Sequence, residues 1–397
     1  MKKIYDLKLD YNLISNRKSV KGVLFLDQIE GCFKKNSKEF KGKKVKLIIG
    51  ERDFSLLENR LLNALKKVKA KTTVLVVDNK SDLSFEASKT DRVVAVGDNL
   101  LLSKVRLSYI SVDCYAIPTT PYIEELFIDK VYIQEGITKS YSVKGFKRVF
   151  IDEDIILTAY KRYFANGYIS VMSKLTALLD YKINCFLSGE NVDGEVFSLT
   201  KRAINLLARI GEYENYQSVI LGAQLILSSL GDVNPFEGSG VDVVKNALGV
   251  YASDLLLGQR ILSAFEKSAK IYHLYFSNDF SNLLSVPDYY SDVQELEKDV
   301  GLDKEFFYSN LKIPSEKRIK LINALILKVR DDFKRETSVI LSVLPTVIKI
   351  YKQIYNKDQK PLSYKQIKNA VTKGSYLSSK TSILTLCRDQ GILKCAN

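Results

Sequence analysis

The first 150 or so residues alternate short runs rich in β-branched residues with amphipathic runs of helical period, and no other feature constrains the fold as strongly. Such alternation is typical of a parallel sheet whose strands are joined by crossover helices. We therefore expect a Rossmann-like α/β domain over residues 1–152, with Leu75 and Ile117 in its core. The strand-like runs lie at 45–50, 73–78 (a buried strand), 92–97, 115–118 and 148–152, the helical runs at 54–67 and 100–109, and a hairpin-like excursion at 130–143.

The pattern changes in the rest of the chain. From Glu153 on, apolar residues recur at spacings of three and four, as at Leu175 and Leu178, and strand-like runs no longer occur. This spacing places apolar side chains on one face of a helix. We therefore expect an all-α domain over residues 153–397. Turn-rich loops between its helices are expected at 285–292 and 356–361.

Composition limits where such a protein works. The chain has 397 residues, 46% of them hydrophobic, which is enough to bury a sizeable core. It contains no apolar stretch of the roughly 18 residues that a membrane span needs, so we expect no membrane association. Its five cysteines are scattered and never form a C-x-x-C pair, which indicates reduced thiols and argues against a disulfide framework or a zinc site. These features predict a cytoplasmic protein.

The formal net charge of +14 raises the question of an anionic partner. Clustered lysines attract phosphate strongly. The two clusters here, at 41–46 and 66–71, each precede a strand-like run, where lysines commonly solvate loops and helix ends. No RNP motif, zinc finger or basic heptad helix accompanies them. We interpret the charge as a solvated lysine-rich surface and keep binding to nucleic acid or to an acidic partner as an alternative.

Several landmarks follow one another in a fixed order. They are Ala95-Val-Gly97, Ala116-Ile-Pro118-Thr-Thr-Pro121, Val149-Phe-Ile-Asp152, the segment from Gly167 to Asp180, and Thr381-Ser-Ile-Leu. This succession resembles the iron- or zinc-dependent alcohol dehydrogenase and dehydroquinate synthase superfamily, and most closely its sn-glycerol-1-phosphate dehydrogenase branch. The resemblance implies a dehydroquinate synthase-like fold, in which the first domain binds a dinucleotide and the helical domain holds a metal and the substrate. It also implies a homodimer.

The dinucleotide loop of the family has the pattern G-G-G-[ST], and its glycines let backbone N–H groups approach a pyrophosphate. The matching residues here are Gly97, Asp98, Asn99 and Leu100. Asp98 would place a carboxylate beside the phosphates, a repulsion of about 4 kcal/mol at about 4 Å and an effective dielectric near 20. We therefore interpret the segment as a vestigial dinucleotide loop, with Asp98 or Asn99 as the N-cap of the following helix.

The metal site that the resemblance implies uses one Asp and two His. Ser170 stands where the Asp is expected, and Leu257 stands where the second His is expected. The first His falls on Val241 or Asp242, depending on the alignment. The whole chain contains one histidine, His273, so two imidazole ligands from one chain are impossible. We expect neither a metal nor a cofactor.

Some residues that could contact a ligand persist in the region of resemblance. Thr119 and Thr120 follow Pro118 and join the vestigial loop, or serve as turn hydroxyls. Lys174 matches a family lysine, or is a solvated helix lysine. Carboxylates alone bind Mg or Mn, which leaves an all-oxygen site as an alternative. The candidates for the cleft between the expected domains are Glu124, Ser170, Lys174, Asp242 and Asp254.

Three functional hypotheses follow. The first is a non-catalytic or repurposed dehydrogenase-like scaffold, a pseudoenzyme that acts by binding a ligand or a partner. The second is an active enzyme of the glycerol-1-phosphate dehydrogenase-like class that uses the cleft on a phosphorylated polyol or sugar, to which a lysine-rich cleft is suited. The third is a basic surface that binds nucleic acid or an acidic partner. We prefer the first because the residues that would run the chemistry differ.

The metal hypothesis is testable on the purified protein. We expect no stoichiometric iron or zinc by elemental analysis, because the positions of the three ligands hold residues that cannot replace an Asp and two His. One metal per chain that disappears on a His273→Ala substitution would contradict this expectation.

Overall fold

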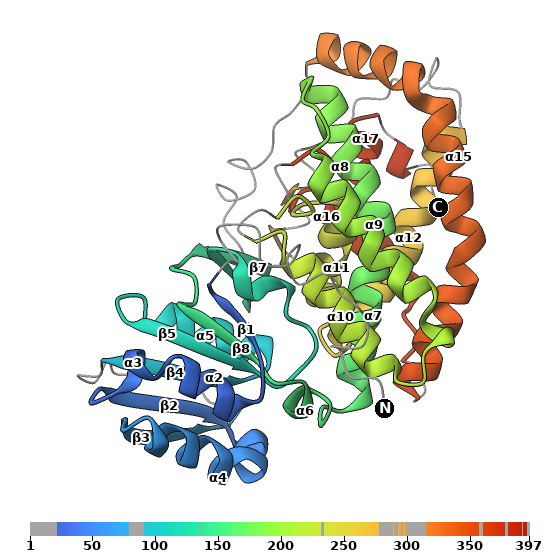
Figure 1. Cartoon of the computed structure of the whole chain (residues 1–397). Coiled ribbons are helices and arrows are strands. Elements are labelled where there is room, and N and C mark those ends of the chain that lie inside the picture. The colour runs from blue at the N-terminus through green and yellow to red at the C-terminus, as the bar shows by residue number, and fades with distance from the viewer. Residues whose placement is uncertain are drawn as a thin grey trace. The chain divides into compact units, whose positions relative to one another are not determined.

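The structure of the protein is a computed structural model (Figure 1). It describes residues 22–78, 91–135, 137–231, 234–277, 289, 293–294, 297–298, 315–356, 360–377, 380–390 and 392–394. The strands are β1 (Leu24–Leu26), β2 (Lys44–Gly50), β3 (Lys71–Val77), β4 (Arg92–Gly97), β5 (Asp113–Pro118), β6 (Lys130–Glu135), β7 (Ile137–Ser142) and β8 (Arg148–Ile151).

The helices fall between and after these strands. They are α2 (Ile29–Lys35), α3 (Ser37–Phe40), α4 (Glu51–Lys67), α5 (Asn99–Ser108), η2 (Glu124–Phe127), α6 (Glu153–Ile156), α7 (Lys161–Met172), α8 (Lys174–Ser188), α9 (Gly194–Ala208), η3 (Ile210–Glu212), α10 (Tyr216–Ser228), α11 (Gly240–Tyr251), α12 (Leu257–Ser277), α15 (Glu316–Tyr355), α16 (Tyr364–Gly374), α17 (Ile383–Asp389) and η5 (Ile392–Lys394). The described residues form two compact units. Unit 1 draws on Met1–Ile133, Lys139–Gly167 and Lys201–Asn234, and unit 2 on Gln134–Thr138, Tyr168–Thr200 and Pro235–Asn397.

Unit 1 contains a six-stranded sheet with the order β1-β8-β5-β4-β2-β3. Every pair of neighbouring strands is parallel. The chain runs outward from β2 to β3, crosses back past β2 to β4, and then continues in the opposite direction to β5 and β8. The direction of winding therefore reverses between β2 and β4, the place where doubly wound sheets bind their ligands.

The central strands are buried on both faces, because their side chains alternate between two layers of helices. Val45, Leu47 and Ile49 of β2 belong to a core cluster that also takes in residues of α2, α3 and α4. Figure 1 shows these three helices beside β2 and β4. Ile48 of β2 and Ala95 of β4, which point the other way, are also fully buried. Helix α5 packs against β4 and β5.

Two expectations about this sheet need correction. The run at 73–78 was expected to be a buried strand with Leu75 in the core, but β3 is the edge of the sheet. Leu75 is half-buried, and Val74 and Val76 are exposed. The strand β1 and the short helices α2 and α3 were not predicted, because the three residues of β1 are too few for a clear period. The other predicted strands, the two helical runs and the two-stranded excursion are present.

Helix α10 belongs to unit 1 although it lies far along the chain. The side-chain oxygen of Gln224 accepts a hydrogen bond from the N–H of Ile123 at 3.4 Å, and its amide nitrogen donates to the carbonyl of Gly167 at 2.9 Å. Gly167 permits this approach, since a Cβ at that position would lie 2.9 Å from Ile220. These contacts attach α10 to the loop after β5 and to the first turns of α7.

The described part of unit 2 is formed by helices apart from a short piece of the β6–β7 ribbon. Helix α12 packs against α11, α15 and α17. The half-buried position of Leu175 corrects the expectation of a core residue, whereas Leu178 is buried. The predicted fold class, a parallel α/β part followed by a helical part, is confirmed. The predicted loop at 285–292 lies almost wholly outside the described residues.

Four of the five cysteines lie in described parts of the chain: Cys32, Cys114, Cys185 and Cys387 are free and buried. Burial raises the pKa of the Cys32 and Cys114 thiols to about 12, so both stay protonated. Cys395 lies outside the described residues. Among the helices that the structure describes, none combines the length and the apolar character that crossing a bilayer requires.

The contrast between Ile117 and Leu75 gives a stability test within one sheet. Ile117 is fully buried, so Ile117→Ala should lower the free energy of unfolding by about 2–5 kcal/mol. Leu75→Ala removes the same number of carbon atoms from a half-buried edge position and should cost much less. Urea unfolding of the two variants measures the difference. Equal losses would show that β3 is covered as completely as β5.

Candidate functional site

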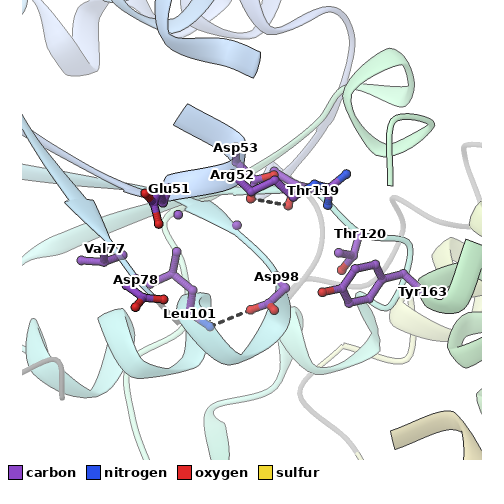
Figure 2. Close-up of a pocket in the computed structure, with 12 residues that line it drawn as sticks. Glu51, Arg52, Asp53, Val77, Asp78, Asp98, Leu101, Thr119, Thr120 and Tyr163 are labelled. Carbon is purple, nitrogen blue, oxygen red and sulfur yellow. Dashed lines mark hydrogen bonds between the residues drawn. The ribbon is translucent and has the colours of Figure 1, made fainter. Parts of the chain in front are cut away.

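A pocket of about 140 Å³ lies in unit 1 at the carboxyl ends of the central strands. Strands β2, β3 and β4 end at Gly50, Val77 and Gly97, which all line the pocket. Strand β5 ends at Pro118, and the next two residues, Thr119 and Thr120, line it as well. The side chains around it are drawn in Figure 2. The lining residues are Gly50, Glu51, Arg52, Asp53, Val77, Asp78, Gly97, Asp98, Leu101, Thr119, Thr120 and Tyr163. The pocket therefore opens where the winding of the sheet reverses.

The N-terminus of α5 borders this pocket and is capped by Asp98. The backbone N–H of Leu101 donates a hydrogen bond of 3.0 Å to the Asp98 carboxylate. This confirms the first of the two predicted capping residues. Asn99 is instead the first residue of α5, and its side-chain amide donates to the Glu125 carboxylate at 2.6 Å. A free helix N-terminus attracts anions with its N–H groups and its dipole, and here a carboxylate of the chain already uses that position.

A buried carboxyl group in the first turn of α4, that of Asp53, forms part of the pocket wall. Asp53 is 8% exposed and accepts a hydrogen bond of 2.9 Å from the Thr119 hydroxyl. Burial raises the pKa of Asp53 and the nearby Asp98 charge adds to the effect, against the Thr119 hydrogen bond and the Arg52 charge. Thr119 also extends the pairing of β5 with β4, since its N–H donates to the carbonyl of Gly97 at 2.9 Å. Thr119 thus bonds to the sheet through its backbone N–H and to Asp53 through its hydroxyl. The sequence did not indicate Asp53.

Thr120 and Tyr163 close the pocket from the other side. Thr120 is 3% exposed. Figure 2 shows the hydroxyl end of Tyr163, from α7, turned toward Asp98 with Thr120 beside it.

The charges around the pocket are mainly negative. Four carboxyl groups line it, from Glu51, Asp53, Asp78 and Asp98, against one cation, Arg52. The Arg52 guanidinium donates to the carbonyl of Thr158 at 2.8 Å and lies 4.1 Å from the centre of the Tyr160 ring. These two contacts fix the position of the Arg52 guanidinium.

The remaining positions of the predicted loop have structural roles. A Cβ on Gly97 would lie 2.6 Å from a methyl group of Leu101, so glycine lets α5 approach the end of β4 closely. Arg106, further along α5, is buried and does not line the pocket. Its guanidinium donates to the carbonyls of Ile128, Lys130 and Lys144. Burial lowers the pKa of Arg106 to about 10, which leaves it charged at neutral pH.

In unit 2, the residues at the expected metal positions do not form a metal site. Ser170 is buried in α7, and Val241 is buried in α11. Lys174, at the start of α8, is half-buried, and its ammonium group lies 5.3 Å from the centre of the Phe236 ring. Asp242 forms an ion pair of 2.6 Å with Lys245, and although burial raises its pKa, the charge of that lysine lowers it overall.

The other cleft candidates are Asp254 and Glu124. Asp254 is exposed and pairs with Lys360. Glu124 begins η2 of unit 1, so it belongs to a different compact unit from Asp242 and Asp254. The described residues contain no group of three or more His, Cys, Asp or Glu side chains placed to hold a metal ion. The site residues present therefore do not fit the iron or zinc that the resemblance implies.

A buried carboxyl group in the described part of unit 2 was not indicated as special by the sequence. Asp180 of α8 accepts hydrogen bonds from the N–H of Gly240 at 2.7 Å and from the N–H of Ile383 at 2.8 Å. These donors are the first residues of α11 and α17. One side chain thus holds the N-termini of two helices, and burial raises its pKa to about 6.

Comparisons of sequence identify relatives at low identity, and no protein-family model matches the chain. The glycerol-1-phosphate dehydrogenase [NAD(P)+] of Pyrococcus furiosus is 25% identical over 272 residues, which are 63% of this chain and 71% of the relative. Proteins of the same name from Halalkalibacterium halodurans and Geobacillus thermodenitrificans are 25% and 23% identical, over 30% and 41% of this chain. The chain spans only 31% and 44% of the length of these two relatives.

Comparisons of structure identify the fold. An archaeal halo-thermophilic alcohol dehydrogenase from a Red Sea brine pool matches with a TM-score of 0.59 and 11% identity, over 95% of this chain and 97% of that protein. The iron-containing alcohol dehydrogenase of Thermotoga maritima matches with a TM-score of 0.55 and 11% identity, over 93% and 98%. The chain therefore has the fold of the iron-containing alcohol dehydrogenases. The predicted resemblance to that superfamily, and to glycerol-1-phosphate dehydrogenases, is confirmed.

Asp180 makes the stability of the protein depend on pH. Its pKa is raised from 3.8 to about 6 by folding, so the folded state binds a proton more tightly than the unfolded state. The contribution of Asp180 to the free energy of unfolding should therefore fall as pH rises from about 4 to about 6, and then stay constant. Urea unfolding of the natural protein and of Asp180→Asn, measured across this range, isolates that contribution. A difference between the two proteins that does not change with pH would contradict the assignment.

Proposed function

We propose that this chain is a dehydrogenase-like protein without dehydrogenase chemistry, which uses the fold to bind a small ligand or a partner. The relatives named above are dehydrogenases, and the fold is theirs. The proposal concerns the site residues, which differ from the pattern that the resemblance implies at both the dinucleotide loop and the metal positions.

One observation carries the proposal: the Asp98 carboxylate accepts the hydrogen bond of the Leu101 N–H at the N-terminus of α5. In a dinucleotide site of this architecture, phosphate oxygens take the N–H groups of such a helix end. A dinucleotide would have to displace the Asp98 side chain and also remain close to its charge. Glu51, Asp53 and Asp78 add further repulsion around the same pocket. The pocket therefore does not fit NAD or NADP.

The second support comes from the chemistry of the metal donors. Serine and leucine at positions 170 and 257 cannot replace a carboxylate and an imidazole as ligands of iron or zinc. Asp242, the remaining acid, is paired with Lys245. Without a metal to polarise the substrate and a nicotinamide to accept hydride, the family reaction has neither of its two reactive partners. We extend the proposal to a cytoplasmic protein that associates as a homodimer.

Calorimetric titration tests the dinucleotide part of this proposal. We expect no measurable binding of NAD or NADP at 1 mM, because Asp98 occupies the helix N-terminus and repels phosphate. Asp98→Gly removes the charge and frees the N–H, at a cost in stability of a few tenths of a kcal/mol to about 1 kcal/mol for the lost cap. This variant should gain detectable binding.

A matched control separates the loss of a cap from the loss of this charge. Asn215 caps α10 in unit 1 by accepting from the N–H groups of Gln217 and Ser218, and it does not line the pocket. Asn215→Gly should lower stability comparably and leave dinucleotide binding undetectable. Binding of NAD to the unaltered protein in the micromolar range would overturn the proposed function and favour an active enzyme.

A further inference from the structure

A second pocket, of about 230 Å³, lies within unit 2 and is lined by side chains of α12 and α16. Nine of its ten lining residues belong to these two helices, and the tenth is Leu393 of η5. The lining residues recur at spacings of three and four, from Lys267 to Leu274 on α12 and from Tyr364 to Thr372 on α16. Residues at such spacings share one face of a helix. The pocket is therefore a groove between two helix faces, and we call it the α12–α16 groove.

The wall of this groove is mainly apolar. Six of the ten lining side chains are aliphatic or aromatic. Leu393 is 6% exposed, whereas Leu274 and Tyr364 are 40% and 65% exposed. Removing apolar surface from water is favourable, so an apolar group that covers Leu274 and Tyr364 gains free energy by doing so. The groove therefore favours an occupant with an apolar part.

The charges of the groove are positive. Among the described residues that line it, three are lysines and none is acidic: Lys267, Lys270 and Lys368. Glu266, outside the lining, pairs with Lys270 at 2.6 Å. Even with that charge neutralised, two cationic side chains remain, one from each helix. A lysine covers apolar surface with its methylene stem and keeps its ammonium group in water. The groove therefore combines an apolar wall with a cationic rim.

The volume of the groove limits the size of its occupant. About 230 Å³ is less than the roughly 300–1,000 Å³ of pockets that enclose drug-sized ligands. A stable protein partner needs roughly 20–30 residues on each side of an interface, and the groove provides ten. A short unbranched hydrocarbon chain fits the apolar space. A carboxylate at its end complements the lysines, because hydrogen bonds between ionised groups are the strong ones.

We propose that the α12–α16 groove binds a small amphipathic carboxylate, an unbranched acyl chain with a free carboxylate group. Each buried methylene strengthens binding about fourfold. An exposed ion pair with one lysine strengthens it by at most about fivefold. The chain therefore provides most of the affinity, and the lysines select the sign of the head group. All lining residues belong to unit 2, so this site goes beyond the proposed function and is independent of the pocket in unit 1.

Three probes with the same chain length separate charge from hydrophobicity. Octanoate is the anion, 1-octanol is its neutral counterpart, and octylamine is the cation. Each is titrated into the full chain by calorimetry, below the concentration at which it forms micelles. We expect octanoate to bind saturably at one site per chain, and octylamine to bind at least tenfold more weakly. Hexanoate should bind roughly tenfold more weakly than octanoate, because it lacks two methylenes.

Two lysine variants test the selection of the head group. Lys267→Met and Lys368→Met keep most of the apolar stem and remove the ammonium group. Each should weaken octanoate binding about threefold and leave 1-octanol binding unchanged. Lys365→Met removes an exposed lysine of α16 that does not line the groove, and it should leave the binding of both probes unchanged.

An apolar variant tests the contact with the chain. Leu274→Gln should weaken octanoate and 1-octanol alike, by at least threefold, because the apolar contact is lost. Leu321→Gln is the matched control, since Leu321 lies on α15, is 60% exposed and does not line the groove. This control should bind both probes normally. Thermal unfolding of each variant verifies that it is folded.

The outcomes decide between this site and its absence. No saturable binding of octanoate, or octylamine binding as tight as that of octanoate, would overturn the inference. Unchanged octanoate binding in all three groove variants, or an equal loss in the two controls, would overturn the assignment to the α12–α16 groove. None of these results bears on NAD binding in unit 1, so the proposed function is tested separately.

Discussion

The parallel pairing of β2 with β4 is the constraint on which the site depends. It brings the end of β2 and the end of β4, which are far apart in the chain, to one edge of the sheet. The helices that follow these strands, α4 and α5, therefore both begin at that edge. More than half of the pocket lining lies on these two strands, in the first turn of α4 and at the start of α5: Gly50, Glu51, Arg52, Asp53, Gly97, Asp98 and Leu101. The topology of the backbone alone thus places a candidate ligand position at this edge, whatever side chains surround it.

The side chains decide which ligands that position accepts. Helix N-termini at the edge of such a sheet attract anions, and phosphate is their usual ligand. In this protein the acidic residues of the first turn of α4 and the cap of α5 provide that negative charge from within the chain. In the function we propose, the same carboxylates that stabilise the two helices repel a phosphate. Under that proposal, the charges that stabilise the helices are also the charges that oppose binding of a dinucleotide.

Sequence periodicity predicted the elements of the sheet where they are long and apolar, as at 92–97 and 115–118. It could not show that β3 is an edge strand, because exposure depends on which neighbours a strand has. The N-cap formed by Asp98 could be predicted from the sequence, since the N–H that it accepts lies three residues away. The hydrogen bond between Thr119 and Asp53 could not be predicted, because these residues are 66 positions apart and no local sequence rule pairs them. The same holds for Arg106, whose carbonyl partners lie on a later segment.

The hydrogen bond from Ile383 to Asp180 joins residues 203 positions apart, and it has consequences for how the chain is made. Each doubling of the length of a closed loop raises the entropic free-energy cost of closing it by only about 0.6 kcal/mol. A long separation in sequence therefore lowers the folding rate more than it lowers the final stability. During synthesis the Asp180 carboxyl group has no second helix to cap until residue 383 has left the ribosome. Unit 2 is therefore expected to complete its fold late, with α8 and α11 exposed in the meantime to chaperones.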